Sequence, residues 1–315
     1  MKIKLFFPFF MLLLLSSCKK EKVIPFQYKT KNVIIVVMDG PRYSETWGDS
    51  THQYIPKMAN FMAKKGIVYT NFYNNGPTYT NAGHTAMTTG FYQEINNSGT
   101  QLPQYPSIFQ HYRKKTKQDS SAIWLVTSKD KLQILSNCED PTWKNKFMPS
   151  AHCGVYGRGI GSGYRPDIYT YLRATEILDS LHPKLMLINF REPDYSAHKN
   201  NWNNYVQGIT SSDNYIYNIW KFIETNPYYK GTTTLLVTND HGRHLDGIED
   251  GFKSHGDNCE GCRHINFYAT GPDFKQNVIL TKNRELIDIS ATVAELLNFE
   301  LPNSNGEIME ELFKK

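Results

Sequence analysis

Apolar runs without alternation divide the chain into segments that read as strands buried on both faces. Residues 32–38 read NVIIVVM, and comparable runs fill 184–190 and 232–238. Strands covered on both faces are typical of the interior of a parallel sheet, so we expect these three segments to be central strands. Further short strands are expected at 67–73, 122–127 and 264–270.

Apolar residues at helical spacing fill the intervals between these strands. The expected helices span 55–65, 82–89, 105–117, 168–181, 203–225 and 285–298. The alternation of strands and helices indicates an α/β fold, a three-layer sandwich with a central, mostly parallel sheet. Residues 136–165 are glycine-rich and irregular, and we expect them to form a cap or insertion over the sheet.

Polar side chains follow the three central runs directly. Asp39 ends the first run, and Asp240 and His241 follow the last one. Asp194 and His198, four residues apart, follow the run between them. The carboxyl ends of parallel strands face the crevice in which α/β proteins bind ligands. Carboxylate and imidazole groups together suit zinc, so the strand ends predict a metal site.

Two further polar features could serve a phosphate group. Thr80 stands at the start of an expected short helix, where free N–H groups and the helix dipole attract anions. A threonine at this place is also an ordinary N-cap. Lys129 and Lys131 follow the strand expected at 122–127, and they are either solvated or placed to hold a phosphate.

The composition is that of a folded chain without a nucleic-acid partner. The 315 residues include 13% aromatic and 21% charged side chains, which is typical of a folded protein. The formal charge of +5 includes Lys2 and Lys4, which lie in an N-terminal segment that we expect to be cleaved. Without them, 33 basic residues face 30 acidic ones, and the remaining +3 is too even for nucleic-acid binding.

Residues 1–17 resemble a bacterial lipoprotein signal peptide. A short basic start is followed by the apolar stretch 5–15 and by small residues before Cys18. The resemblance implies cleavage before Cys18, a lipid anchor to the membrane, and a place in the bacterial envelope (periplasm or outer membrane). An uncleaved anchor helix is the alternative. Residues 18–31 are expected to be a tether and 32–315 the catalytic domain.

Besides Cys18, which the resemblance assigns to the lipid, the chain has four cysteines: Cys138, Cys153, Cys259 and Cys262. An even number in an oxidising compartment favours disulfides. Of the three pairings, the simplest joins Cys138 to Cys153 and Cys259 to Cys262, because both bonds close local loops. A structural zinc site built on Cys259-x-x-Cys262 is the alternative, and it needs two further ligands.

Five motifs resemble, in their order, those of the alkaline phosphatase superfamily, especially its type I phosphodiesterase/nucleotide pyrophosphatase and sulfatase-like branches. They are VVMDG at Asp39, the segment from Thr80 to Gly90, PDYSAH with Asp194 and His198, TNDHG with Asp240 and His241, and Ser254-His255-Gly256. The resemblance covers nearly all of the chain after the signal segment.

Carried over to the matching positions, the resemblance implies two zinc ions. One would be held by Asp194, His198 and His255. The other would be held by Asp39, Asp240, His241 and Thr80. Thr80 lies ten residues before Gly90 and is the implied nucleophile, with Thr78 and Thr85 as alternatives.

The implied activity is hydrolysis of a small phosphoric ester through a phospho-enzyme, with a phosphodiesterase or nucleotide pyrophosphatase-like reaction expected first. An alkaline phosphomonoesterase is the alternative, because Lys129-Asp130-Lys131 is similar to a Lys-Asp-Arg sequence that contacts monoester phosphates. Asn97 is a further candidate contact. A sulfatase is less expected, since the Cys-x-Pro-Ser-Arg pattern is absent. The non-enzymatic alternative is a surface lipoprotein that uses the same fold as a binding module.

Overall fold

The structure is a computed structural model that describes residues 28–302 and 304–314. The expected signal peptide, Cys18 and most of the expected tether lie outside the described residues. Within those residues, no helix has both the length and the apolar character needed to cross a membrane.

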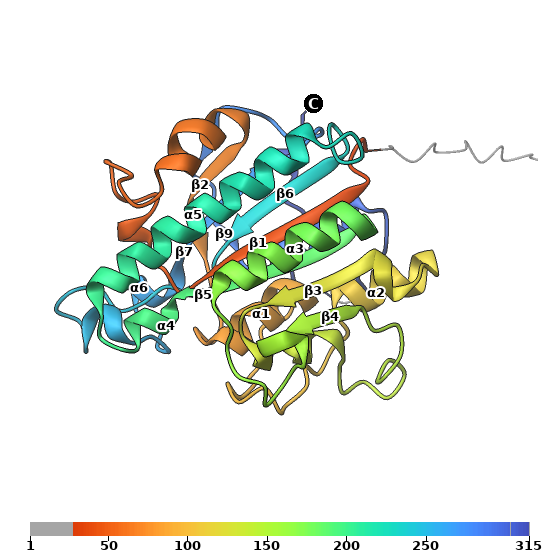
Figure 1. Cartoon of the computed structure of the whole chain (residues 1–315), viewed down its shortest axis with the longest axis horizontal. Coiled ribbons are helices and arrows are strands. Elements are labelled where there is room, and N and C mark those ends of the chain that lie inside the picture. The colour runs from red at the N-terminus through yellow and green to blue at the C-terminus, as the bar shows by residue number, and fades with distance from the viewer. Residues whose placement is uncertain (1–27, 303, 315) are drawn as a thin grey trace, which may run out of the picture.

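One sheet organises the described part of the chain (Figure 1). Its strands are β1 (Asn32–Asp39), β2 (Ile67–Tyr73), β3 (Ile123–Thr127), β4 (Ser150–Cys153), β5 (Leu185–Pro193), β6 (Thr233–Thr238), β7 (His264–Thr270), β8 (Val278–Leu280) and β9 (Arg284–Glu285). Their order is β4-β3-β5-β1-β6-β7-β2-β8, and β9 pairs with β2. All pairs are parallel except β2–β7 and β6–β7, so the predicted mostly parallel sheet is confirmed.

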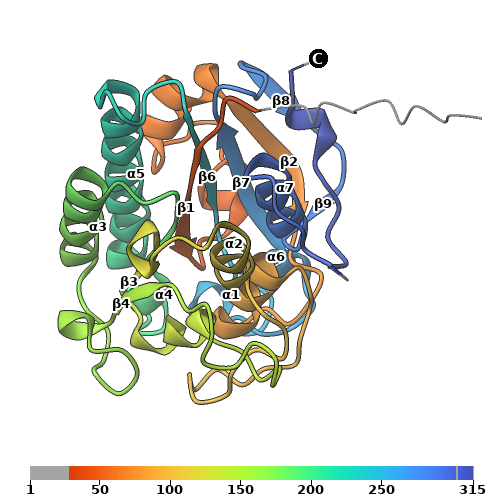
Figure 2. The same cartoon turned by 90° about the vertical axis from the view of Figure 1, so that its right-hand side faces the viewer.

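Helices cover both faces of the sheet and complete the three layers (Figures 1 and 2). They are α1 (Thr80–Thr89), α2 (Ile108–Thr116), α3 (Asp167–Leu181), α4 (Asp194–Ala197), α5 (Trp202–Thr225), α6 (Glu260–Arg263) and α7 (Asp288–Leu296). Alternate β1 side chains enter two separate cores. Val33 and Ile35 pack toward α1, α2 and α7, whereas Ile34 and Val36 pack toward α3 and α5. Every β1 residue is buried, as the unbroken apolar run predicts.

Three expected elements differ in detail. The helix expected at 55–65 consists of the π-helical turn Met58–Met62 and the 3-10 turn Ala63–Lys65. The helix expected from residue 285 begins only at Asp288, because Arg284–Glu285 pairs with β2. The expected cap at 136–165 contributes edge strand β4, whose SAHC sequence lacks the apolar run that marks the other strands.

The sheet brings the polar residues after β1, β5 and β6 to one edge. β1 lies between β5 and β6 and runs parallel to both. Asp39 pairs in register with Pro193, the residue before Asp194. The strand order therefore gathers the predicted metal ligands, as expected for carboxyl ends of adjacent parallel strands.

Candidate active site

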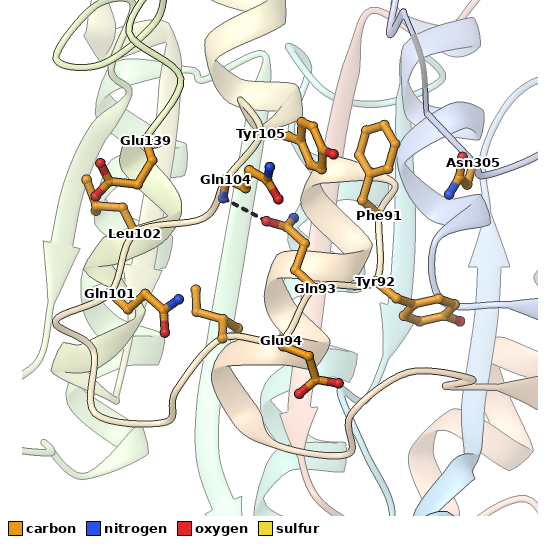
Figure 3. Close-up of a pocket in the computed structure, with 11 residues that line it drawn as sticks. Phe91, Tyr92, Gln93, Glu94, Gln101, Leu102, Gln104, Tyr105, Glu139 and Asn305 are labelled. Atoms are coloured by element: carbon orange, nitrogen blue, oxygen red, sulfur yellow. Dashed lines mark hydrogen bonds between the residues drawn. The ribbon is translucent and has the colours of Figure 1, made fainter.

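A cavity of about 760 Å³ lies beside the segment that follows α1, apart from the predicted ligands (Figure 3). Phe91, Tyr92, Leu102 and Tyr105 contribute to its lining, and the Gln104 N–H donates a 2.7 Å hydrogen bond to Gln93 nearby. None of the predicted metal ligands lines this cavity. Its size alone does not make it the reaction centre, because the groups that can do chemistry gather elsewhere.

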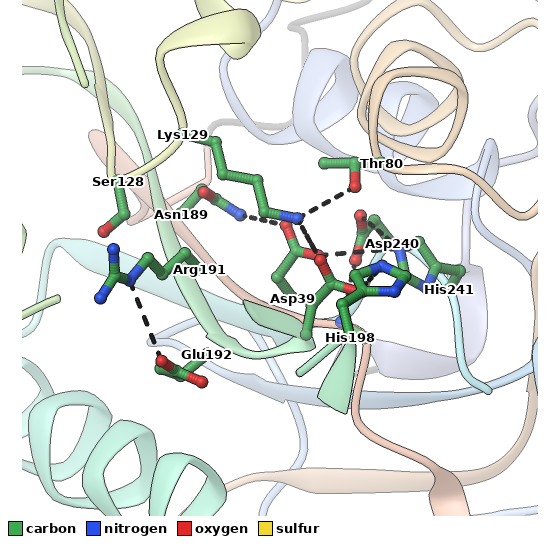
Figure 4. A network of polar contacts seen from close by, with 12 residues as sticks. Asp39, Thr80, Ser128, Lys129, Asn189, Arg191, Glu192, His198, Asp240 and His241 are labelled. Atoms are coloured by element: carbon green, nitrogen blue, oxygen red, sulfur yellow. Dashed lines mark hydrogen bonds and ion pairs between the residues drawn. The ribbon is translucent and has the colours of Figure 1, made fainter. Parts of the chain in front are cut away.

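Three buried carboxylates form the centre of the site (Figure 4). Asp39 is the last residue of β1, Asp194 begins α4 directly after β5, and Asp240 lies two residues after β6. All three side chains are withdrawn from solvent. Burying ionised carboxylates is costly unless cations compensate them, so the site requires nearby positive charge.

Thr80 is held against this centre by the close packing of α1. Every residue of α1 is buried. A Cβ on Gly83 would lie 2.4 Å from the carbonyl oxygen of Asp240, so only glycine allows this approach of the helix to the strand end. The start of the helix, with Thr80 as its first residue, is thereby fixed beside the carboxylates.

Lys129 links the nucleophile candidate to two of the carboxylates. Its buried Nζ lies 2.7 Å from Asp39 Oδ1, 2.6 Å from Asp194 Oδ2 and 3.1 Å from Thr80 Oγ1 (Figure 4). Burial opposes the charged form, but Asp194 and Asp39 outweigh it and raise the pKa of Lys129. The two carboxylates therefore favour the charged form of the lysine.

Asn97 and Lys131, the other two residues predicted to contact phosphate, bond to each other, and Asn97 also bonds to the start of α1. Asn97 Oδ1 accepts hydrogen bonds from the Asn81 N–H at 3.0 Å and from Lys131 Nζ at 2.8 Å. Burial and the neighbouring Lys129 lower the pKa of Lys131 to about 8. A side-chain amide bonded to a second lysine thus lies at the start of α1, against the residue that follows Thr80.

The first predicted metal group converges in the structure. His198 Nε2 lies 3.1 Å and His255 Nε2 3.3 Å from Asp194 Oδ1, and the two nitrogens are 3.2 Å apart. His255 Nδ1 lies 2.7 Å from the Thr78 carbonyl oxygen, which directs Nε2 toward the aspartate. Such an outer contact orients histidine ligands in metal sites.

The second predicted group also converges. His241 Nε2 lies 3.4 Å from Asp240 Oδ2 and 3.7 Å from Asp39 Oδ1. Burial holds the pKa of His241 well below its ordinary value, so the ring is neutral, as a ligand must be. His241 stacks on His255 with ring centroids 3.7 Å apart, which makes the two groups neighbours.

The atoms of this centre fit a cation. Asp240 Oδ2 and His241 Nε2 are buried and lack a hydrogen-bond partner among the described residues. Burial and the adjacent Asp240 raise the pKa of Asp39 to about 7, even though Lys129 opposes the shift. The negative charge is therefore not fully compensated by protein groups. Carboxylate oxygens and imidazole nitrogens together suit zinc.

Two residues of the centre were missed in the sequence. Arg243 is fully buried, and its Nη1 lies 2.5 Å from Asp194 Oδ1. His84 Nδ1 lies 3.3 Å from Asp240 Oδ2, and its Nε2 lies 3.2 Å from the Asn189 side chain. Arg243 stands directly after the Asp-His-Gly motif, and His84 stands within the segment from Thr80 to Gly90. Their closeness to these motifs was the available signal.

These additions allow a second grouping of the donors. Ligand atoms that lie within 4.8 Å of one another also group as Asp194 with His241 and His255, and as Asp39 with His84 and Asp240. The predicted groups share most of these residues, so the donors form one continuous cluster. The predicted aspartates and histidines therefore lie together, Thr80 is linked to them through Lys129, and His84 is an additional candidate donor beside Asp240.

The predicted disulfides are wrong for this structure. Cys138, Cys153, Cys259 and Cys262 are all free thiols. The Cys153 side chain hydrogen-bonds with Thr127, and Cys138 bonds with Gln110, so these two thiols have separate partners. Cys259 and Cys262 contact each other and Asp257 as thiols.

A protein-family comparison matches residues 130–301, more than half of the chain, to the metalloenzyme superfamily. The chain belongs to this superfamily. The matched region contains Asp194, His198, Asp240, His241 and His255. The family model and the grouped donor residues therefore both indicate metal ions.

Solved structures of the alkaline phosphatase superfamily share the fold. The phosphonate monoester hydrolase of Silicibacter pomeroyi superposes with a TM-score of 0.66 at 13% identity, over 89% of this chain and 76% of its own. A superfamily protein from Vibrio parahaemolyticus gives 0.65 at 16%, over 92% and 72%. Murine ectonucleotide pyrophosphatase/phosphodiesterase 5 gives 0.61 at 14%, over 90% and 100%. The predicted α/β sandwich is confirmed.

Sequence relatives match a shorter stretch. A 2,3-bisphosphoglycerate-independent phosphoglycerate mutase of Gracilaria tenuistipitata var. liui is 31% identical over 127 residues, and that of Antithamnion sp. is 26% identical over 149. These matches cover 39% and 45% of this chain. The chain spans about a quarter of the length of either relative (23% and 27%).

Proposed function

We propose that the protein is a zinc-dependent hydrolase of phosphoric esters that uses Thr80 as its nucleophile. The observation that carries the proposal is that the Thr80 hydroxyl lies 3.1 Å from the Lys129 ammonium, which itself contacts Asp39 and Asp194 of the two groups of metal donors. The fold supports it, since murine ectonucleotide pyrophosphatase/phosphodiesterase 5 shares it and an inactive variant of that protein was solved with AMP.

The groups around Thr80 suit attack on phosphorus. Lys129, paired with Asp39 and Asp194, stabilises negative charge on the Thr80 oxygen as its proton leaves. The oxygen then bonds to phosphorus while the bond to the leaving oxygen breaks, and the leaving oxygen takes up a proton in place of the one that Thr80 lost, which gives phosphothreonine and the free alcohol. The oxygen of a water molecule then bonds to phosphorus, the bond to Thr80 breaks, and a proton from that water restores the Thr80 hydroxyl as the phosphate product leaves. Zinc ions held by the two donor groups would supply Lewis acidity to this chemistry.

The phosphoryl oxygens would face the start of α1. This ten-residue helix directs the positive end of its dipole toward Thr80. Asn97 and Lys131, which are joined by a 2.8 Å hydrogen bond, lie on the same side. These groups hold and orient the phosphoryl group, while the buried setting strengthens each interaction.

Substitution of Thr80 tests the proposal. Thr80→Ala should lower turnover of p-nitrophenyl phosphate and bis(p-nitrophenyl) phosphate by at least about 10³-fold, because the nucleophile is lost. Thr85→Val is the matched control, since the Thr85 hydroxyl is buried without a hydrogen-bond partner among the described side chains. Unchanged turnover in Thr80→Ala, or in protein treated with EDTA, would refute the mechanism. Absence of turnover in the zinc-loaded wild type would favour a binding module.

A phosphomonoesterase is the second candidate, and the two lysines favour it. The expectation of a diester rests on the family resemblance alone. Lys129 adds a cation 3.1 Å from the Thr80 hydroxyl, Lys131 adds a second basic group near Lys129, and a monoester carries one more negative charge than a diester. Lys131→Ala should therefore lower kcat/KM for the monoester more than for the diester. An equal loss for both substrates would count against the monoester.

We also propose that the chain is exported and lipid-anchored at Cys18. The support is the lipobox resemblance of residues 1–18. Metabolic labelling with a radioactive fatty acid, in the wild type and in Cys18→Ser, tests this assignment. Label in the wild type that is absent from the variant is expected, and equal labelling would refute it.

A further inference from the structure

A second cluster of metal donors lies outside the candidate active site. It consists of His244, Asp257, Cys259 and Cys262, whose ligand atoms all lie within 4.8 Å of one another. His244 Nε2 and Asp257 Oδ2 are 3.1 Å apart. His244 and Cys262 are buried, whereas Asp257 is open to solvent. The cluster therefore sits at the surface, with its nitrogen and one sulfur on the inner side.

The backbone holds the two segments of the cluster together. The Gly242 N–H donates to the Cys262 carbonyl at 2.8 Å, and the Arg243 N–H donates to the Gly261 carbonyl at 2.9 Å. A Cβ on Gly242 would lie 2.0 Å from the Gly261 oxygen, so this approach requires glycine. The Cys259 N–H donates to Asp257 Oδ1 at 2.9 Å, which leaves Oδ2 facing His244. The fold itself thus brings the four donors into one place.

His244 is oriented in the way that metal-binding histidines are. Its Nδ1 lies 3.2 Å from both Asp250 Oδ1 and Ser254 Oγ. Its Nε2 is buried, and its 3.1 Å contact with Asp257 Oδ2 does not have hydrogen-bond geometry, so Nε2 has no hydrogen bond within the described part of the chain. A carboxylate on one ring nitrogen with the other left for the ion is the common arrangement around zinc.

We propose that His244, Asp257, Cys259 and Cys262 bind one structural zinc ion. One nitrogen, one oxygen and two sulfurs complete a tetrahedral site, which is how structural zinc is held. Bond lengths of about 2.0–2.3 Å place the ligands of one ion within roughly 4 Å of one another, so small side-chain rotations suffice. Binding releases the thiol protons of Cys259 and Cys262 to solvent and needs no oxidant, unlike a disulfide between them.

The position of the cluster gives this zinc a structural purpose. His241 lies three residues before His244, and His255 lies two residues before Asp257. The Asp257 carbonyl also accepts a 2.8 Å hydrogen bond from Thr78 Oγ1, near the start of α1. The ion would close the intervening loop and fix the segment that carries His255. The inference does not depend on the proposed catalytic activity.

Cobalt substitution tests the site without an activity assay. The donors of the candidate active site contain no sulfur, so a thiolate-to-cobalt charge-transfer band reports on this cluster alone. The full chain loaded with Co²⁺ should show the band. Cys259→Ser/Cys262→Ser should lose it, whereas the control Cys138→Ser/Cys153→Ser should keep it.

Two results would overturn the proposal. One is the absence of the band in the cobalt-loaded wild type, which needs no variant to fold. The other is a disulfide between Cys259 and Cys262, found by mass spectrometry of the non-reduced protein as isolated from its native compartment. A His244→Ala variant that keeps the wild-type band unshifted would likewise remove the histidine from the site.

Discussion

The donors of the candidate active site come from two kinds of backbone. Asp39, Asp240 and His241 lie at the ends of central strands and are completely buried. His198 and His255 are carried by loops, and the His198 side chain is 48% exposed. His255 depends on the Thr78 carbonyl and on stacking against His241.

This difference separates positions fixed by the sheet from positions fixed by a few local contacts. The hydrogen bonds that pair β1 with β5 and β6 also place the strand-end carboxylates, so these stay in position as long as the sheet exists. No such series of strand-pairing hydrogen bonds holds the histidines in the loops. We call Asp39, Asp240 and His241 the strand-end half, and His198 and His255 the loop-borne half. We expect substitutions in the strand-end half to abolish most activity, and activity lost by substitutions in the loop-borne half to recover when metal is abundant.

The largest effect is expected from Asp240→Asn in the strand-end half. Loss of a charged donor removes several kcal/mol of transition-state stabilisation, which corresponds to a fall in kcat/KM of about 10³-fold. Added zinc should not restore activity, because the neutral amide is a poor ligand. Steady-state kinetics across a zinc titration measure this. Asp246→Asn is the control, since that side chain is 86% exposed, and full recovery of Asp240→Asn would break the comparison.

A smaller effect is expected from Gly83→Ala, which tests the rigidity of the same half. The new Cβ would lie 2.4 Å from the Asp240 carbonyl oxygen, and neither backbone segment can move freely. Overpacking should cost about 1–3 kcal/mol of stability. Displacement of Thr80 should lower kcat by roughly 10- to 100-fold.

The control for Gly83→Ala is Ala86→Gly in the same helix. It weakens α1 by about 1 kcal/mol but introduces no clash. Thermal unfolding and kcat are measured on both variants. Equal activity in the two variants would show that α1 can shift to accommodate the new Cβ without displacing Thr80, which contradicts a rigid strand-end half.

The loop-borne half should respond more mildly. His198→Ala should lose roughly tenfold activity at limiting zinc, the low end of the range for changes around a metal site. Excess zinc should restore most of it by mass action, since Asp194 and His255 remain. Activity as a function of free zinc distinguishes this from Asp240→Asn. A loss that zinc cannot reverse would place His198 with the strand-end residues.

The smallest effect on activity is expected from a buried cluster far from both halves. Glu311 binds Arg284 at 2.6 Å and 2.8 Å and accepts a hydrogen bond from Tyr69. Although burial opposes it, the bonds to Arg284 and Tyr69 lower the pKa of Glu311 to about 2. A folded-state pKa below the ordinary value of about 4.3 stabilises the protein above that value, and the gain disappears as pH falls toward 2.

Glu311→Gln should therefore lower the melting temperature at pH 7 and match the wild type near pH 2. The exposed Glu310→Gln is the control. Melting curves between pH 2 and 7 measure the convergence, and kcat should be unchanged throughout. A pH-independent difference between Glu311→Gln and the wild type would contradict the pKa shift.

Much of the fold and the ligand set could be predicted because both follow local patterns. Unbroken apolar runs mark β1, β5 and β6, and the polar residues after them are visible in the sequence. Strand β4 could not be predicted, because its polar sequence pairs only through its neighbour β3. Arg243 was missed for a related reason, since its role depends on Asp194, which is remote in the chain.

The contacts of Lys129 could not be predicted either, because they join residues that are far apart in the sequence. Its place after β3 suggested a phosphate contact, but the strand order puts its ammonium between Asp39 and Asp194. Nothing local in the sequence indicates that β3 lies two strands from β1. The free cysteines are a further case, since their partners Thr127 and Gln110 come from other elements.

Lys129 and Arg243 also bear on how the protein folds. Together they place two positively charged side chains among three buried carboxylates. The chain thus carries its own partial counter-charge for these acids, which offsets part of their mutual repulsion when the sheet closes around them.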